Sequence, residues 1–267
     1  MASPDLEAQV NAAKAYEALL VPALTGQWVP QLLDAAGVRA GQRILDVACG
    51  TGVVAREAQR RTGPTGYVAG LDPSAGMLAV AKQTTPAVDW REGVAESIPF
   101  PPDSFDAVVS QFGLMFTQPE QAIREMLRVS RPDGRVVAAT WDAIENIPAY
   151  AAEARLFEEL AGSRAAAPLR APFALGDRED LTTSFARAGA SRVTVDTLTG
   201  VARFPSIRVM VEADLRGWLP AMGVNLAEDQ IIDILAAAEP TLRPFMFPGE
   251  GASFALRMHL VVAGRRG

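Results

Sequence analysis

The chain has 267 residues, of which 49% are hydrophobic and 21% are charged, a composition that is ordinary for a soluble globular enzyme. Its formal net charge of −6 does not fit the basic surface of a nucleic-acid-binding protein, so we expect no nucleic-acid partner. The single cysteine excludes an intrachain disulfide framework.

The N-terminal stretch carries acidic residues and no apolar core of the kind that a signal peptide needs. No apolar run in the sequence reaches the length that spans a membrane. We therefore expect a cytoplasmic protein without a membrane partner. Nothing in the sequence indicates the oligomeric state.

Runs rich in valine, isoleucine and leucine alternate with helical patterns, which is typical of βαβ units and a parallel sheet. The chain is expected to begin with helices over 5–36, interrupted at Pro22 and again near Pro30. Strands are then predicted near 43–48, 67–72, 87–91, 105–111 and 134–141, and helices near 52–62, 74–84, 118–130 and 177–188. Segment 162–176 is the most loop-like stretch.

Two stretches near the C-terminus, 191–204 and 253–265, alternate in the manner of strands, and we expect them to pair as antiparallel neighbours. Between them, 205–251 forms an insertion with apolar residues at helical spacing. A second helix in this insertion is predicted over 225–239, ending before Pro240.

The stretch ILDVACGTG, residues 44–52, ends an apolar run in a glycine loop. Residues 50–55 match G-x-G-x-x-A, one form of the dinucleotide-binding fingerprint. Asp72 ends the next predicted strand, where an acid can accept hydrogen bonds from both ribose hydroxyls of an adenosine. These features alone fit NAD and S-adenosylmethionine (SAM) equally well.

Asp46 distinguishes the two cofactors. NAD would place an anionic pyrophosphate over the glycines, and the carboxylate would repel it. SAM would place an α-ammonium and a sulfonium there, which the carboxylate attracts through charge-assisted bonds. The alternative is that Asp46 only caps a helix or stabilises a turn.

These motifs and those that follow resemble the class I SAM-dependent methyltransferases, in particular the ubiquinone/menaquinone-biosynthesis-type small-molecule methyltransferases. The resemblance covers about 42–142 and rests on four ordered stretches, namely ILDVACGTG, GLDPSAGML, REGVAESIPFPPDSFDAVVSQFGLMF and EMLRVSRPDGRVVAATWD. It implies an α/β fold with a Rossmann-like sheet of seven strands, mostly parallel with one antiparallel. Helices are expected on both faces, with a helical cap inserted between the last two strands.

The implied domains are N-terminal helices (1–40) that cover the site, a SAM-binding domain (41–204 and 252–267) and a helical cap (205–251).

The resemblance also implies which residues bind the methionine part of SAM. Gly50 and Gly52 let the backbone approach the cofactor, with Asp46 beside them. Ala48 stands where the family often has a third glycine, and its carbonyl is the expected acceptor for the α-ammonium. Gln111, at the end of the fourth strand, matches a position that faces the methionine part.

For the adenosine part, the resemblance places Asp72 on the ribose and packs Met77 on the adenine. The family usually has an acid where this chain has Val94, so the contact to the adenine amino group passes to Glu96 or to a water. The backbone amide of Ala95 is the expected donor to the adenine ring.

The acceptor is expected to be a small molecule, apolar or aromatic. The stretch Ser110-Gln111-Phe112-Gly113 lacks the [DNS]-P-P-[YFW] pattern of enzymes that methylate nucleobase amino groups. No cysteine lies outside the first motif to act as a nucleophile or metal ligand, so we expect no metal. The acceptor atom (O, C, N or S) stays open.

The cover over the acceptor pocket is expected from the N-terminal helices, the segment after Trp141 and the insertion. Tyr16 resembles a tyrosine that closes over the cofactor in related enzymes, although packing into the core is an equal alternative. The candidate apolar lining is Phe112, Trp141, Tyr150, Met210, Trp218, Phe245 and Phe247, and the polar candidates are Asp142, Tyr150, Arg208 and Glu250.

No catalytic base is assigned. His259 is the only histidine, and we expect it to be structural. If the last strand starts at the active-site end near Ser253, His259 lies roughly 20 Å away, at about 3.4 Å per residue. Besides a methyltransferase, two alternatives remain: a SAM-binding protein without catalysis, and an NAD(P)-dependent oxidoreductase.

Overall fold

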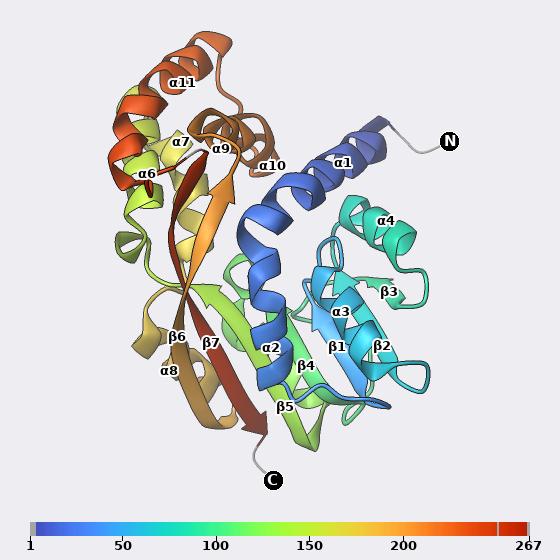
Figure 1. Cartoon of the computed structure of the whole chain (residues 1–267). Coiled ribbons are helices and arrows are strands. Elements are labelled where there is room, and N and C mark those ends of the chain that lie inside the picture. The colour runs from blue at the N-terminus through green and yellow to red at the C-terminus, as the bar shows by residue number, and fades with distance from the viewer. Residues whose placement is uncertain (1–3, 250, 266–267) are drawn as a thin grey trace.

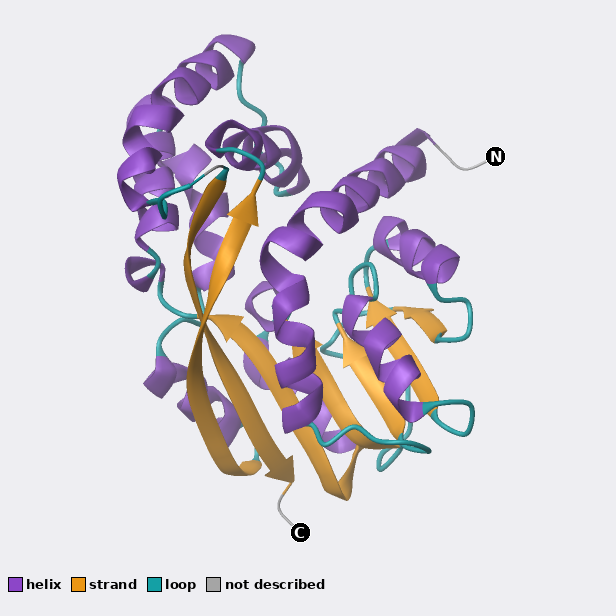
Figure 2. Cartoon of the chain, in the orientation of Figure 1, coloured by secondary structure: helices purple, strands orange, loops and turns teal. Residues whose placement is uncertain are grey.

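The computed structural model describes residues 4–249 and 251–265 and contains a seven-stranded sheet with helices on both faces (Figure 2). The strands lie in the order β3-β2-β1-β4-β5-β7-β6 across the sheet. In chain order they are β1 (Arg43–Val47), β2 (Tyr67–Asp72), β3 (Asp89–Glu92), β4 (Phe105–Gln111), β5 (Ser130–Trp141), β6 (Ala190–Phe204) and β7 (Ala252–Arg265).

Strand direction confirms the predicted fold class. The strands from β1 to β5 pair in parallel, whereas β7 is antiparallel to both of its neighbours, β5 and β6. The two C-terminal strands therefore pair as expected. Leu45, Val108 and Val136 of the central strands are fully buried because helices cover both faces, which explains why these strands appear in the sequence as apolar runs.

Two hydrophobic clusters fill the space between the helices and the sheet. One contains Leu32 of α2 and Val54 of α3, and the other contains Ile123 of α5 and Phe185 of α8. The helical elements are α1 (Pro4–Ala15), η1 (Tyr16–Thr25), η2 (Gly26–Trp28), α2 (Val29–Ala35), α3 (Val53–Thr62), α4 (Ala75–Thr84), η3 (Leu114–Phe116), α5 (Pro119–Val129), η4 (Ile144–Asn146), α6 (Pro148–Ala161), α7 (Ser163–Arg170), η5 (Ala171–Phe173), α8 (Arg178–Arg187), α9 (Ile207–Ala213), η6 (Asp214–Trp218), α10 (Leu219–Ala221), α11 (Glu228–Leu242) and η7 (Arg243–Phe245).

The β6–β7 hairpin projects beyond the rest of the sheet (Figure 1). Trp141, the last residue of β5, pairs with Met258, although β7 already begins at Ala252. His259 pairs with Thr140 and so lies level with the end of β5. The expectation that it lies far from the active-site end was wrong, because it assumed that β7 starts level with the parallel strands.

Helices gather around the projecting end of the hairpin (Figure 1). Between β6 and β7 lie α9, η6, α10 and α11, and Ser206 caps α9 by accepting a hydrogen bond of 3.1 Å from the amide of Val209. These helices pack against α6 and α7, which precede β6 in the chain. The cover is therefore assembled from two separate segments.

Two local expectations about the second half of the chain were wrong. Segment 162–176 is largely helical (α7 and η5) rather than loop-like. Its Ala165, Ala166 and Leu169 are buried in the hydrophobic cluster that contains Leu32 and Val54. The helix α11 continues past Pro240 to Leu242, because Leu242 is fully buried in the same cluster. Tertiary packing overrides local propensity in both cases.

The N-terminal helix also does not break at Pro22. It continues through this residue as π-type turns, in which the amide of Gly26 bonds to the carbonyl of Val21. A short 3₁₀ turn then precedes α2, with Pro30 in its first turn, as expected from the sequence. Among the described residues, none of the helices combines the length and the apolar character that crossing a membrane requires.

Candidate functional site

The glycine loop joins β1 to α3 at the carboxyl end of the parallel strands. Ala48, Gly50 and Gly52 all adopt left-handed backbone conformations, with φ of 56°, 54° and 85°. A Cβ on Gly52 would lie 2.4 Å from the indole of Trp90, so only glycine fits there. A Cβ on Gly50 would meet nothing within 4 Å, which leaves open space on that side of the loop. The loop thus exposes backbone to a ligand at Gly50.

Asp46 lies beneath this loop and is only 1% exposed. Its carboxylate accepts a hydrogen bond of 3.0 Å from the amide of Ala55, in the first turn of α3. This is the helix-capping geometry that was the alternative for Asp46. Burial raises the pKa of Asp46 to about 8, opposed by the bond from Ala55, and the nearby Asp72 raises it further.

Asp72 lies at the end of β2 and binds the loop from its other side. One carboxylate oxygen accepts a hydrogen bond of 2.8 Å from the amide of Gly50, and the other accepts one of 2.9 Å from Ser74. Burial raises the pKa of Asp72, although both bonds lower it. Gly50 is therefore bound to one acidic side chain, with the second, Asp46, buried close enough to interact with Asp72, which favours a cationic ligand over an anionic one.

The residues that were expected to contact the adenine lie on separate segments of the structure. Met77 lies in the first turn of α4, where its amide donates a hydrogen bond of 3.3 Å to the hydroxyl of Ser74. Ala95 is buried, and Val94 is 46% exposed. The carboxylate of Glu96 accepts a hydrogen bond of 2.7 Å from the amide of Gln118, so it is already bound at the start of α5.

Two buried oxygen atoms near the end of β4 lack a hydrogen bond of acceptable geometry among the described residues. Gln111 donates a hydrogen bond of 3.2 Å to the carbonyl of Thr25, but its amide oxygen has no hydrogen-bond partner. The hydroxyl of Thr25 also lacks a hydrogen bond of acceptable geometry, although Tyr16 is close enough to interact with it. Unsatisfied buried oxygens are costly unless a ligand or water completes them. Together with the open space at Gly50 and the two acids, they fit a ligand with an amino acid moiety.

The N-terminal helical segment lies over this loop (Figure 1). Glu17 of η1 accepts a hydrogen bond from the hydroxyl of Thr51 and pairs with Arg56 at 2.7 Å. Helix α1 crosses α4 at Gly76, where a Cβ would lie 2.6 Å from Gln9. The chain therefore covers the loop with its own N-terminus.

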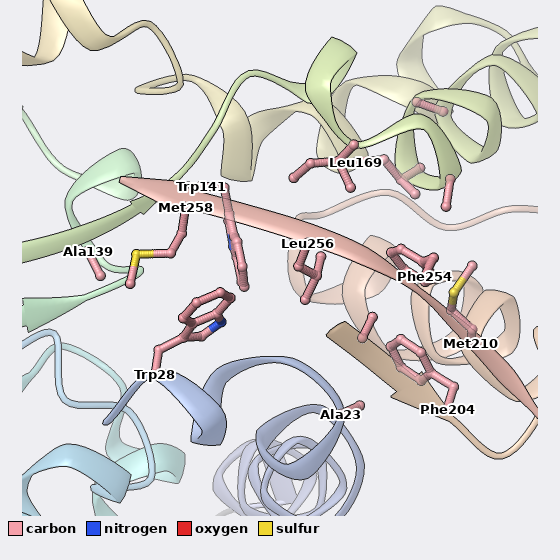
Figure 3. Close-up of a cluster of buried hydrophobic side chains, with 14 of the residues drawn as sticks. Ala23, Trp28, Ala139, Trp141, Leu169, Phe204, Met210, Phe254, Leu256 and Met258 are labelled. Atoms are coloured by element: carbon pink, nitrogen blue, oxygen red, sulfur yellow. The ribbon is translucent and has the colours of Figure 1, made fainter. Parts of the chain in front are cut away.

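Beside the loop lies an apolar cavity of about 130 Å³. Phe112 follows Gln111 directly, and its ring stacks on Trp141 at 3.8 Å. Figure 3 shows Trp141, Phe204 and Met210 among the buried side chains between the N-terminal segment and the hairpin. The lining residues are Tyr16, Leu20, Leu24, Thr25, Phe112, Phe116, Trp141, Tyr150, Leu169, Pro172, Phe173, Phe204, Met210, Asp214 and Trp218.

Most of the apolar lining expected from the sequence is therefore confirmed. Phe245 and Phe247 do not line the cavity and are 37% and 44% exposed. Tyr16 does line it, at the junction of α1 and η1. Cys49, the single cysteine of the chain, is buried.

The polar candidates are mostly engaged elsewhere. Asp142 is buried and pairs with Arg257 at 2.7 Å and with His259 at 3.3 Å. His259 also bonds through its two ring nitrogens to the carbonyl of Gly176 and the hydroxyl of Thr197, both at 2.9 Å. Its neighbour Met258 packs in the cavity-side cluster, so His259 faces the other side of the sheet.

Of the remaining polar candidates, Arg208 is exposed, Glu250 lies outside the described residues, and Tyr150 lines the cavity. Two acids that the sequence did not single out lie here instead: Asp214 lines the cavity, and the completely buried Glu153 is next to it. No sequence motif marks them, since each lies in an ordinary helical pattern. In the part of the chain that the structure describes, no group of three or more histidine, cysteine or acidic side chains is arranged to hold a metal ion.

Comparisons with known proteins identify the family of the chain. A family model described as "Methyltransferase domain" matches residues 45–138. The chain is 34% identical over 189 residues to the ubiquinone/menaquinone biosynthesis C-methyltransferase UbiE of Pseudomonas putida, a match that covers 64% of this chain and 74% of that relative. It is 44% identical over 116 residues to the demethylmenaquinone methyltransferase of Renibacterium salmoninarum, which covers 43% of this chain and 48% of that relative.

Among solved structures, a putative methyltransferase from an antibiotic biosynthesis pathway of Anabaena variabilis superposes with a TM-score of 0.63. The two are 18% identical, and the superposition covers 89% of this chain and 97% of that one. The fold and the site thus define a methyltransferase whose cofactor is SAM. The chain belongs to the class I SAM-dependent methyltransferases of the ubiquinone/menaquinone type, and it acts on a small molecule.

Proposed function

We propose that this methyltransferase acts on a small apolar or aromatic acceptor that binds in the cavity lined by Phe112 and Trp141. The observation that supports this is the position of the cavity, which begins at the residue after Gln111 and is closed by aromatic side chains. An engineered cavity of about 150 Å³ holds benzene, so the volume here suits a single ring. The names of the curated relatives, which refer to quinone biosynthesis, also favour a ring-shaped acceptor.

For the cofactor, we propose the following residue roles. Asp72 binds the ribose, Gly50 and the carbonyl of Ala48 face the methionine part, and Gln111 binds it through the unpartnered amide oxygen. Asp46 lies beneath the loop, where a bound cationic ligand favours its ionised form and so makes it a buried counter-charge. Because its carboxylate already caps α3, its attraction for the α-ammonium passes through the loop rather than through direct contact.

The remaining contacts of the proposal lie on the adenosine side and above it. Met77 packs on the adenine, the amide of Ala95 bonds to the ring, and Tyr16 closes the site. Glu96 can reach the amino group only if it releases the amide of Gln118, so a bridging water is the better candidate. Gly52 allows the left-handed backbone of the loop and leaves room for the indole of Trp90.

When bound, SAM supplies an electrophilic methyl group. The chain's contribution is to hold the acceptor in line with this group and to keep water out, and orientation alone can supply roughly 7–11 kcal/mol of the barrier.

Two broader points belong to this proposal. The chain divides into N-terminal helices that cover the site (1–40), a SAM-binding domain (41–204 and 252–267) and a helical cap (205–251), which is supported by the packing of the helices between β6 and β7 around the cavity. We also propose a cytoplasmic location, which cell fractionation would test.

The first experiment is isothermal titration of the purified chain with SAM, with S-adenosylhomocysteine (SAH) and with NADH as the control. Micromolar binding of the two adenosyl ligands without NADH binding is expected. Radiolabelled methyl transfer to a panel of single-ring aromatic acceptors then tests the acceptor class. SAM binding without turnover on any acceptor would favour a non-catalytic SAM-binding protein, and binding of NADH alone would contradict the assignment of the loop.

A further inference from the structure

Glu153 and Asp214 form a pair of acids at the cavity. Glu153 lies on the buried face of α6, one helical turn after Tyr150, and its exposed fraction is 0%. Asp214 begins η6, in the segment between β6 and β7. Asp214 and Tyr150 line the cavity, and Glu153 stands behind them.

The pair is isolated from basic side chains. Both oxygens of Glu153 lack a hydrogen bond of acceptable geometry in the described structure, although Asp214 is close enough to interact with it. Among the described residues, neither acid forms an ion pair. The charged residues of the surrounding helices are paired at the surface instead, as Arg216 with Glu212 and Glu228, and Arg170 with Glu158.

Burial is the main influence on the protonation of this pair. It raises the pKa of Glu153 well above the usual value, and the negative charge of Asp214 raises it further. Burial also raises the pKa of Asp214, and the hydrogen-bonding interaction with Glu153 lowers it. Tyr150 is the other titratable group that interacts with the pair, and burial followed by the two acids raises its pKa. Two carboxyl groups in one buried site hold at least one proton between them near neutral pH.

We propose that Asp214 is the polar anchor of the acceptor site, where it binds a hydroxyl or amino group on the acceptor ring and takes its proton, and that Glu153 is the positioning residue behind it. This inference rests on the proposed function, since it assigns a polar contact within the same cavity. An apolar cavity with a few convergent polar groups is the usual composition of a small-molecule site, and Asp214 is the acidic side chain among the described residues that line this one.

The acceptor's oxygen or nitrogen forms a bond to the methyl carbon, the sulfur–carbon bond breaks and its electron pair stays on sulfur. The proton of the acceptor passes to the carboxylate of Asp214. Glu153 keeps its own proton throughout and donates a hydrogen bond toward Asp214, which holds the Asp214 carboxylate in place.

The first test needs no acceptor. Infrared spectra of the wild-type protein and Glu153→Gln are compared at pH 7, with Glu159→Gln as the control, because Glu159 lies on the same helix but is exposed. The wild type minus Glu153→Gln difference should contain the carbonyl stretch of a protonated acid, whereas the control difference should contain only carboxylate bands. A carboxylate band in the Glu153→Gln difference would overturn the role of Glu153.

The second test measures binding of phenol, aniline and toluene by ligand-observed NMR with SAH present. Replacing Asp214 with leucine should lower the affinity for phenol or aniline relative to toluene by about 10- to 100-fold, since it removes a hydrogen bond to a charged group. Loss of preference for phenol alone identifies a hydroxyl acceptor, and loss for aniline alone identifies an amine. If the affinity for phenol and for aniline, each relative to toluene, is the same in the wild type and in Asp214→Leu, the proposal is overturned.

Two further measurements separate the causes of failure. SAH affinity should stay within about twofold in both variants, because neither residue contacts the loop; if the wild type itself does not bind SAH, the proposed function fails rather than this inference. If Asp214→Leu does not fold, the near-isosteric Asp214→Asn replaces it. In that variant the affinity for phenol or aniline relative to toluene should fall by about tenfold, and an unchanged relative affinity counts against the proposal.

Discussion

The carboxylate of Glu17, in the N-terminal helical segment, accepts a hydrogen bond of 2.5 Å from the hydroxyl of Thr51 in the glycine loop. The same carboxylate pairs with Arg56, so one side chain of η1 binds both the loop and the helix that follows it. The position of the covering segment and the conformation of the loop are therefore linked by direct contacts.

Replacing Glu17 with alanine should loosen this cover. Hydrogen exchange within 16–25 should become faster, and the free energy of unfolding should fall by about 1 kcal/mol, because a partly exposed ion pair contributes little. Exchange monitored by mass spectrometry measures the first effect and urea denaturation the second. Glu7→Ala, an exposed position on α1, is the control; the same increase in both variants would refute a specific contact.

Replacing Asp72 with alanine should weaken SAH binding by about tenfold or more, since a hydrogen bond to a charged group is worth about 1.5–3 kcal/mol. The domain should stay folded, as judged by circular dichroism. Calorimetry measures the affinity, and Asp180→Ala, an exposed acid on α8, serves as the control. An affinity equal to that of the wild type would mean that the ribose binds elsewhere.

Alanine at three glycines should separate stability from binding. Gly52→Ala combines the strain of a left-handed backbone with a clash against Trp90. It should lower the free energy of unfolding by about 2–5 kcal/mol. The methyl group of Gly50→Ala points into open space, so this variant should lower the free energy of unfolding by only about 1–2 kcal/mol. The same methyl group should obstruct the binding of SAH. Gly63→Ala, at the end of α3, also places its methyl group in open space, but its φ of 65° and ψ of −167° belong to a region that essentially only glycine adopts. It should therefore lower the free energy of unfolding in urea denaturation at least as much as Gly50→Ala does, while binding SAH normally. Normal SAH binding by Gly50→Ala would contradict the placement of the cofactor.

The pKa of Asp46, raised from 3.8 to about 8, predicts a pH-dependent stability. The folded protein holds this proton more tightly than the unfolded chain does. The stabilisation is complete below about pH 4 and is lost as the pH rises through about 8. The loss reaches up to about 1.4 kcal/mol per pH unit.

The variant Asp46→Asn cannot titrate at this position. Its stability relative to the wild type should therefore increase between pH 5 and pH 8, with urea denaturation at each pH as the measurement. The exposed Asp180→Asn should show no such trend. A difference between Asp46→Asn and wild type that does not change with pH would mean that Asp46 is ionised in the folded protein.

The sequence predicted the cofactor half of the molecule well, because local rules determine it. Left-handed glycines, an acid at the end of each of two strands and buried apolar runs each leave a short signature around residues 44–72. The strands and helices of this region begin and end within two residues of the predictions.

The acceptor half was predicted less well, because its features depend on contacts between distant segments. The burial of Glu153 is set by helices more than fifty residues further along the chain, and no pattern within α6 distinguishes it from an exposed acid. His259 was placed too far from the site because the length of the hairpin beyond β5 is a property of its pairing with β6. Pro22 and Pro240 were expected to end helices that packing carries through them.

The projecting hairpin has a consequence for how this enzyme can diversify. The helices around its projecting end supply Met210, Asp214 and Trp218 to the cavity proposed for the acceptor, outside the part of the sheet that supports the glycine loop. Substitutions in the helices around the arm can reshape what is methylated while the machinery for the methyl donor stays intact. The region that binds the methyl donor can thus stay constant while the helices around the hairpin vary. Altered substrate preference should be sought first among side chains such as Met210 and Trp218.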